Sequence, residues 1–288
     1  MKIYIEGRGK VATTKFIPAL LRLGWTEVPD INEAEVVYVA SPPSTHPESV
    51  RFALSLGKHV LCEKPLVKTA IESESICEYA RKNGLALLES FPCFYHPVWS
   101  GLSEISDVKD EKVDVVARFH IPMAPTGWRL YKANLGAVSD MFVYIVKLAQ
   151  WLGMSPDCTK EGHYTILDNI ITAVSGKLTE GKYSLSYSVA YMQEFESTAQ
   201  FIFPTRSYLI SKAFNPSIDD NVKCTIFEDG KEWGVFRNSD PWGHMIRYFQ
   251  HLIEHVDDRE PEYKQIVKQA TLLERLISGI ADVDNIHW

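Results

Sequence analysis

The chain has 288 residues, of which 45% are hydrophobic and 23% are charged, a balance typical of one large or two modest globular domains. Its formal net charge is −7 and it has no Lys/Arg cluster, which argues against nucleic acid or an anionic membrane surface as a partner. No apolar run is long enough to span a bilayer, and five scattered cysteines without a CxxC pair predict neither a disulfide framework nor a metal site. Buried thiols, and an N-terminus that opens directly into a strand, predict a cytoplasmic protein.

The first predicted element is a strand at Lys2–Glu6, followed by a glycine-rich turn and a helix. The turn has the pattern G-x-G-x-x-A. In such a turn the glycines let the backbone approach a pyrophosphate, and the N-terminus of the helix supplies amide groups. The pattern predicts a dinucleotide site, and the alternative is a simple glycine-rich turn. The predicted cofactor-binding residues here are Gly7, Arg8, Gly9, Lys10 and Val11.

A shortened stretch follows, where a dinucleotide fold has a second strand and a crossover helix. Only the eleven residues from Trp25 to Glu35 separate the first helix from the buried strand Val36–Ala40. They have room for a short strand and one helical turn. Asp30 has the spacing of a ribose ligand, or it is an ordinary surface acid. The adenosine half of the site is therefore predicted to be reduced.

A polar loop, Ser41-Pro42-Pro43, follows the strand Val36–Ala40, and a helix is predicted from about Pro47 to Leu56. Ligands of parallel α/β sheets bind beyond the carboxyl ends of the strands. Ser41, Pro42, Pro43 and His46 are therefore predicted to face a cofactor, and the alternative for His46 is to cap the helix.

The next buried strand, His59–Cys62, ends in Glu63-Lys64-Pro65, which completes a βαβ unit. A lysine at this turn, with proline fixing the start of the next segment, is a candidate proton donor or acceptor. The alternative is a solvated turn lysine. Glu63 either orients the turn, binds the cofactor or is only an acid at the end of a strand.

From Lys112 onward the hydrophobic period becomes two, as in Val113, Val115, Ala117 and Phe119, which predicts an antiparallel sheet. A second stripe contains Tyr183, Tyr187 and Tyr191 and is interpreted as a sheet face. Further strands are predicted at Thr198–Phe203, Ser207–Ala213, Lys223–Phe227 and Glu232–Phe236.

The segment His251–His255 spells H-x-x-E-H, a zinc-peptidase pattern. It lies on a predicted C-terminal helix, and the sequence offers no well-placed third ligand. We expect no metal site here.

Taken together, the chain resembles the Gfo/Idh/MocA family of nicotinamide-dependent oxidoreductases, named for glucose–fructose oxidoreductase and inositol dehydrogenase. The resemblance covers nearly the whole chain outside the shortened stretch. It depends on the segments 7–12, 40–46, 57–66, 95–97, 127–129, 136–140, 152–153, 245–249 and 272–278.

The resemblance implies a Rossmann-like α/β domain, here residues 1–110, followed by a domain with a large, open, mostly antiparallel sheet, here 111–288, whose C-terminal helix can pack back on the first. It also implies NAD or NADP as cofactor, a homo-oligomer (dimer or tetramer) and a proton-transfer role for Lys64. A lysine partly desolvated beside an oxidised nicotinamide has its pKa lowered toward neutral pH. The sequence leaves open whether the Lys64–Pro65 peptide is cis.

The resemblance also places an aspartate, and a histidine four residues later, on a helix that lines the substrate pocket. Here these positions are Asp140 and Tyr144. Tyr144 either donates a proton or a hydrogen bond to the substrate oxygen, or packs beneath the sheet. Arg129, beside Trp128, binds an anionic group or forms a salt bridge at the domain interface. The predicted substrate-binding residues are Tyr95, Trp128, Arg129, Asp140 and Tyr144.

The sequence therefore predicts an NAD(P)-dependent oxidoreductase acting on a sugar-like or cyclic polyol or its keto form. One alternative is a non-catalytic nucleotide- or sugar-binding protein of the same fold. Another is a reductase of a non-sugar carbonyl or conjugated system.

Overall fold

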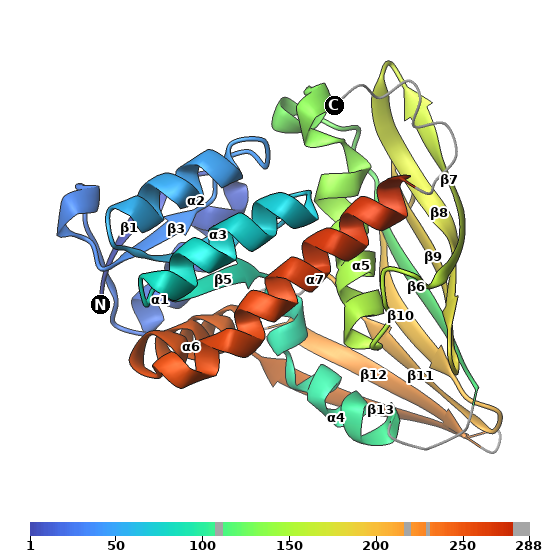
Figure 1. Cartoon of the computed structure of the whole chain (residues 1–288). Helices are drawn as coiled ribbons and strands as arrows, with labels where there is room; N and C mark the ends of the chain where they lie inside the picture. The colour runs from blue at the N-terminus through green and yellow to red at the C-terminus, as the bar shows by residue number, and fades with distance from the viewer. Residues whose placement is uncertain (107–111, 216–219, 229–230, 279–288) are drawn as a thin grey trace. The chain divides into compact units, whose positions relative to one another are not determined.

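The computed structural model describes residues 1–106, 112–215, 220–228 and 231–278 (Figure 1). Contacts divide the chain into two compact units. The first unit joins Met1–Tyr95 to Asp240–Glu274, so the chain enters it twice, and its N-terminal part ends at Tyr95, before residue 110. The second unit contains His96–Ser239 and resumes at Arg275.

Among the described residues, the first unit contains a five-stranded sheet in the order β2-β1-β3-β4-β5, with every pair parallel. All four residues of the central strand β3 are buried, as expected of a parallel sheet covered on both faces. The strands are β1 (Lys2–Glu6), β2 (Thr26–Glu27), β3 (Val36–Val39), β4 (His59–Glu63) and β5 (Leu87–Ser90).

The helices of the first unit supply its hydrophobic core. A cluster of buried side chains joins β3, β4 and β5 to α2, α3 and α7, so these three helices cover one face of the sheet (Figure 1). The helix α6 packs against η3 and α1. The elements are η1 (Ala12–Phe16), α1 (Ile17–Arg22), η2 (Ile31–Glu33), α2 (His46–Ser55), α3 (Ala70–Lys82), η3 (Pro92–Tyr95), α6 (Pro241–Glu254), η7 (Val256–Asp258) and α7 (Arg259–Ser278).

The connection between β2 and β3 is as short as the sequence predicts. β2 has two residues, paired with Lys2 and Ile3 of β1. The single turn η2 takes the place of a crossover helix. The outer strand and helix that would support an adenosine are thus reduced to residues 26–35.

The second unit contains, in the described part of the chain, an eight-stranded sheet in the order β13-β12-β11-β10-β6-β9-β8-β7. Only the pair of β6 and β9 is parallel among the pairings described. The predicted fold class, a shortened Rossmann-like sheet plus a mostly antiparallel one, is therefore confirmed. The strands are β6 (Val113–Ile121), β7 (Thr159–Leu167), β8 (Ile170–Glu180), β9 (Tyr183–Tyr191), β10 (Glu196–Ile202), β11 (Arg206–Ser211), β12 (Asp220–Glu228) and β13 (Lys231–Ser239).

The alternation of hydrophobic and polar residues along β6 arises because one face of the strand is buried. Val113, Val115 and Ala117 are buried, whereas Asp114 and Arg118 are exposed. Aromatic rings of Trp99, Trp151 and Phe201 pack together in the core of this unit, with centroids 5.6–6.3 Å apart. The remaining elements are α4 (Pro97–Ser106), η4 (Gly127–Leu130), η5 (Lys132–Asn134), η6 (Val138–Phe142) and α5 (Val143–Trp151).

A search of the described ranges finds no helix with both the length and the apolar character needed to cross a bilayer.

Candidate active site

Lys64 lies in the turn after β4, and buried groups hold the backbone that follows it. The Nδ1 atom of His46 lies 2.8 Å from the carbonyl oxygen of Pro65. The buried Glu89 accepts a hydrogen bond from the backbone N–H of Leu66 at 2.9 Å. The Lys64–Pro65 peptide is cis. Lys64 itself is half-buried, so its amine sits on a turn whose position other side chains determine.

His46 links this turn to the loop after β3. Its side chain is fully buried, and Nε2 lies 2.8 Å from the carbonyl oxygen of Ser41. Burial lowers the pKa of His46, whereas the carbonyls of Pro65 and Ser41 act in the opposite direction. The imidazole therefore lies beneath the two loops and contacts the backbone of both, and a contact of His46 with a cofactor stays a prediction. Pro43 is also buried, while Ser41 and Pro42 retain exposed surface.

Glu63, at the end of β4, forms hydrogen bonds with residues of the two neighbouring strands, β3 and β5. Its Oε1 atom accepts hydrogen bonds from the hydroxyl of Tyr38 on β3 at 2.7 Å and from that of Ser90 on β5 at 2.8 Å. Of the three roles open to Glu63 from the sequence, these contacts favour orienting the turn. A direct contact with the cofactor stays a prediction.

The glycine-rich turn fits the approach of a pyrophosphate. Gly7 has φ of +91°, and a Cβ atom there would lie 2.5 Å from the carbonyl oxygen of Ala40, so only glycine is accommodated. A Cβ atom on Gly9 would meet nothing within 4 Å. The backbone N–H of Thr13 donates to the carbonyl oxygen of Gly9 at 3.0 Å, which is the first hydrogen bond of the helix. The amides of Lys10, Val11 and Ala12 precede this bond and therefore belong to the first turn, where backbone N–H groups have no partner within the helix. An open glycine beside such amides is what an anionic dinucleotide requires.

The predicted ribose ligand, Asp30, has a local partner. Its Oδ1 atom accepts from the backbone and side-chain nitrogens of Asn32, both at 2.9 Å, and so caps η2. A role in binding ribose stays a prediction. Sequence spacing overlooked Glu27, which ends β2 and pairs with Arg8 of the glycine-rich turn. Glu27 is a second acid at this edge of the sheet.

In the second unit, Asp140 is the centre of a polar cluster. It accepts hydrogen bonds from Nε and Nη2 of Arg129 at 2.5 and 3.3 Å, and from the hydroxyl of Tyr191 at 2.9 Å. Burial and the charge of Asp140 raise the pKa of Tyr191, which keeps this phenol protonated. The sequence interpretation of Tyr191 as part of a sheet face missed this contact. Of the roles predicted for Arg129, a salt bridge is present, and its partner Asp140 lies in the same unit.

The helical segment that carries Asp140 is wound as a π-helix over Val138–Phe142, and α5 continues it. Such short π-helical segments often mark functional positions. Tyr144 is half-buried and packs edge-on against Phe119 at 5.5 Å between centroids. The face of Trp128 lies against the guanidinium of Arg129, 4.5 Å from its ring centre. Tyr144 therefore packs within the unit while retaining some exposed surface.

Other predicted residues are engaged in packing. The ring of Tyr95 lies 5.5 Å from that of Tyr248 on α6, and the carbonyl of Tyr95 is 3.1 Å from Nδ1 of His244. His251 of the H-x-x-E-H pattern lies 2.6 Å from Asp258. Among the described residues no group of three or more His, Cys, Asp or Glu is arranged to hold a metal ion.

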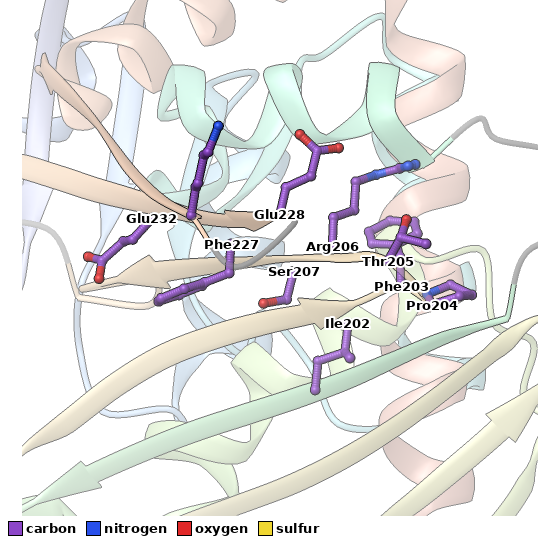
Figure 2. Close-up of a pocket in the computed structure, with 10 residues that line it drawn as sticks. Ile202, Phe203, Pro204, Thr205, Arg206, Ser207, Phe227, Glu228 and Glu232 are labelled. Carbon is purple, nitrogen blue, oxygen red and sulfur yellow. The ribbon is translucent and has the colours of Figure 1, made fainter.

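A hollow of about 510 Å³ lies at the ends of the hairpins β10–β11 and β12–β13. Its lining side chains project to both sides of the strands, with Glu228 and Arg206 on one side and Phe227 and Ile202 on the other (Figure 2). The hollow therefore lies at the end of the sheet, and none of the predicted site residues lines it. A smaller pocket of about 80 Å³ is lined by Arg129.

Comparisons with known proteins agree with this architecture. Residues 10–91 match the model of an oxidoreductase family with an NAD-binding Rossmann fold. A dTDP-3,4-didehydro-2,6-dideoxy-alpha-D-glucose 3-reductase from Actinomadura kijaniata is 24% identical over 276 residues, which cover 90% of this chain and 81% of that protein. A scyllo-inositol 2-dehydrogenase (NADP(+)) from Bacillus subtilis is 27% identical, over 57% of this chain and 56% of that protein.

A crystal structure of a 3-ketoreductase from Actinomadura kijaniata, in complex with TDP-benzene and NADP, has the same fold. Its TM-score is 0.84 at 20% identity, and the match covers 97% of this chain and 98% of that chain. The same reductase has been solved with a lysine replaced by glutamate or alanine, and with a tyrosine replaced by phenylalanine.

The fold and the glycine-rich turn define a Rossmann dinucleotide-binding unit joined to an open, mostly antiparallel sheet. Residues 10–91 match the model of the Gfo/Idh/MocA oxidoreductases, and the chain is similar to a reductase over 90% of its length. The resemblance drawn from the sequence is confirmed, and so is its implication of an NAD(P)-dependent oxidoreductase.

Proposed function

We propose that the protein transfers hydride between NAD or NADP and a carbon of a sugar-like or cyclic polyol or its keto form, with Lys64 as general acid and base. The observation that carries this proposal is the pair of buried contacts, from His46 to Pro65 and from Glu89 to Leu66, that hold the turn of Lys64. A solvated turn lysine would need no such support.

Proton transfer is most efficient from a group held in position near the reacting oxygen. The reduced nicotinamide, when bound, supplies the hydride. Lys64 donates a proton from Nζ to the carbonyl oxygen of the substrate as negative charge develops there. In the direction of oxidation, the neutral amine takes the proton from the hydroxyl group.

For the cofactor, we assign the pyrophosphate to the turn Gly7–Val11, because Gly9 is open and the amides after it start a helix. We assign the adenosine ribose to the edge of the sheet beside β2, where Arg8 pairs with Glu27. Because β2 has two residues, this edge offers little surface to an adenosine. We therefore assign most of the cofactor affinity to the pyrophosphate and the nicotinamide.

For the substrate, we assign the polar cluster of the second unit. Asp140 accepts hydrogen bonds, Arg129 and Tyr191 donate them, and Tyr144 adds a phenol from the same helical segment. Such a set suits a ligand that has several hydroxyl groups. The relatives named above support this substrate class, since one is a reductase of a deoxy-sugar nucleotide and another a dehydrogenase of an inositol.

The test of the proton-transfer role is the variant Lys64→Met. We expect it to bind NADP(H) like the wild type, by titration calorimetry, and to lose about 10²- to 10⁴-fold in turnover. The matched control is Lys82→Met on α3, whose side chain is 72% exposed. Equal turnover of Lys64→Met and wild type would reject the role of Lys64. A wild type that binds neither NAD(H) nor NADP(H) would reject the whole proposal.

We also propose that the protein is a cytoplasmic homo-oligomer. The four described cysteines without a disulfide are all buried, which suits a reducing compartment. The face of the large sheet opposite the core carries half-buried residues such as Val116, Ser186 and Gln200, and a second copy would cover them. Light scattering should give two or four times the chain mass of 32.7 kDa, and a monomer mass would exclude the assembly.

A further inference from the structure

The parallel sheet of the first unit contains one whole mononucleotide-binding half and one reduced half. A dinucleotide fold of this kind is built from two βαβαβ halves, and the first of them binds the adenosine. The strands β3, β4 and β5, joined by the helices α2 and α3, form a complete half. On the other side of β1 the described sheet ends at β2, which has only two residues and is followed by the single turn η2. The reduced half is therefore the one that an adenosine needs.

The acids near the end of β2 already have partners within the protein. In a complete site, an acid in this position accepts a hydrogen bond from the 2′-hydroxyl group of the ribose. Here Glu27, which ends β2, pairs with Arg8 of the glycine-rich turn. Asp30 accepts two hydrogen bonds of 2.9 Å from Asn32. A ribose would have to displace these donors, and the exchange of one hydrogen bond for another gains little free energy.

The ion pair of Arg8 and Glu27 also affects the 2′-phosphate that distinguishes NADP from NAD. The segment 26–35 has four acids and no lysine or arginine, so its own charge repels a phosphate. Arg8 is a cation that reaches the end of β2, but its guanidinium group is engaged by Glu27. The acid that could bind the ribose and the base that could bind its phosphate therefore neutralise each other.

The rest of the first unit has the groups that a nicotinamide mononucleotide needs. Gly9 leaves open space at the glycine-rich turn, and the amides after it have no partner within the helix. A single phosphate can accept hydrogen bonds from these amides as a pyrophosphate does. The complete half also carries the candidate general acid, since Lys64 directly follows β4. Phosphate binding and hydride transfer therefore both depend on parts of the fold that are whole.

From these observations we infer that the protein accepts nicotinamide mononucleotide in place of the dinucleotide, and that it binds NAD and NADP equally well. The inference rests on the proposed function and names the cofactor class of the same site. The nicotinamide ring, the ribose attached to it and one phosphate are common to all three cofactors. A remote part of a ligand adds affinity only through contacts of its own. The adenosine that the mononucleotide lacks would lie at the edge where Arg8 and Glu27 engage each other.

Titration calorimetry of the full chain with NADH, NADPH and reduced nicotinamide mononucleotide (NMNH) tests the inference. We expect the Kd values of NMNH and of NADPH each to lie within about tenfold of the Kd of NADH. We also expect NMNH to displace NADH at concentrations at which 5′-AMP, the half that NMNH lacks, does not. A Kd of NMNH or NADPH that differs from that of NADH by more than about tenfold would overturn the inference. Displacement of NADH by 5′-AMP as efficiently as by NMNH would also overturn it.

The variant Glu27→Ala tests the part played by the ion pair. It releases Arg8 for the 2′-phosphate, so the Kd of NADPH should fall at least about fivefold while that of NMNH stays at its wild-type value. Adding Arg8→Ala to this variant should abolish the gain. The matched control is Glu74→Ala, an exposed acid of α3, which should leave all three Kd values unchanged. Equal NADPH binding by Glu27→Ala and wild type would overturn the role given to the pair.

These titrations separate the inference from the proposed function. If NADH binds and reduces a keto sugar but NMNH binds more than about tenfold more weakly, the inference fails and the proposed function stands. If NMNH binds as NADH does but neither cofactor reduces or oxidises a sugar or polyol, the cofactor class is established and the hydride-transfer proposal fails.

Discussion

Nδ1 of the buried His46 lies 2.8 Å from the carbonyl oxygen of Pro65, the residue next to Lys64. Its other ring nitrogen is equally close to the carbonyl of Ser41. One imidazole therefore joins two loops that follow neighbouring parallel strands. His46 is a positioning residue in this arrangement, because it acts on Lys64 only through the backbone.

The variant His46→Leu removes both contacts while keeping an apolar side chain in the site. We expect the turnover number to fall about 10- to 100-fold, since small displacements of a proton donor are costly. The Kd of NADP(H) should change much less. Steady-state kinetics and calorimetry measure the two effects. His46→Gln, whose amide can reach one carbonyl, should recover part of the turnover, and a folded His46→Leu protein of normal turnover would contradict the positioning role.

Replacing Asp140 by asparagine should separate substrate binding from cofactor binding. Arg129 loses its charged partner, and Tyr191 loses an anionic acceptor for its hydroxyl. We expect kcat/KM to fall about 10- to 100-fold, while the Kd of the cofactor stays at its wild-type value. Tyr191→Phe removes only one bond and should have a smaller effect. The exposed Asp157→Asn is the control, and an equal loss there would show that the cluster has no special role.

Arg259 should contribute strongly to the stability of the first unit. Its side chain is buried and donates to the carbonyls of Leu252, Ile253 and Gly84. Arg259→Met leaves these acceptors without a donor. The free energy of unfolding should therefore fall by about 3 kcal/mol, measured by denaturant titration. The control is Arg51→Met, an exposed arginine 3.9 Å from Glu72, which should change the stability by less than about 1 kcal/mol.

Stability should also decrease in mild acid because of His59. The backbone N–H of Ala86 donates to Nδ1 of His59 at 2.9 Å, which requires an unprotonated nitrogen. Burial, followed by the charge of Arg259, lowers the pKa of His59 below 6.5. The neutral form therefore stabilises the fold above pH 6.5, and this contribution is lost as the pH falls through the lowered pKa.

The variant His59→Asn keeps an acceptor for Ala86 but cannot be protonated in this range. We expect its melting temperature to fall less steeply below pH 6.5 than that of the wild type. The exposed His163→Asn, on β7, should follow the wild type. Parallel curves for His59→Asn and wild type would show that His59 does not contribute to the acid sensitivity.

The sequence predicted the features that depend on neighbouring residues. The turn of Lys64 can be inferred from the apolar strand that precedes it. The short β2 can be inferred because the segment 25–35 has only eleven residues. Contacts between distant segments could not be inferred. The bond from Tyr191 to Asp140 spans 51 positions, and the role of His46 depends on where the carbonyl of Pro65 points. β7 and β8 were missed, and along β7 no residue is buried, so its hydrophobic pattern is weak.

The first unit is discontinuous, and this determines when it can fold during synthesis. The hydroxyl of Tyr263 on α7 donates to the carbonyl of Leu85 at 2.6 Å, and Ile266 and Ala270 of the same helix complete the core over β3 and β4. A ribosome that has made residues 1–95 has therefore produced the parallel sheet without one of its covering helices. All strands of the second sheet, from Val113 to Ser239, emerge before that helix does. The N-terminal unit thus becomes complete last, in contrast to the N-to-C order in which domains generally fold.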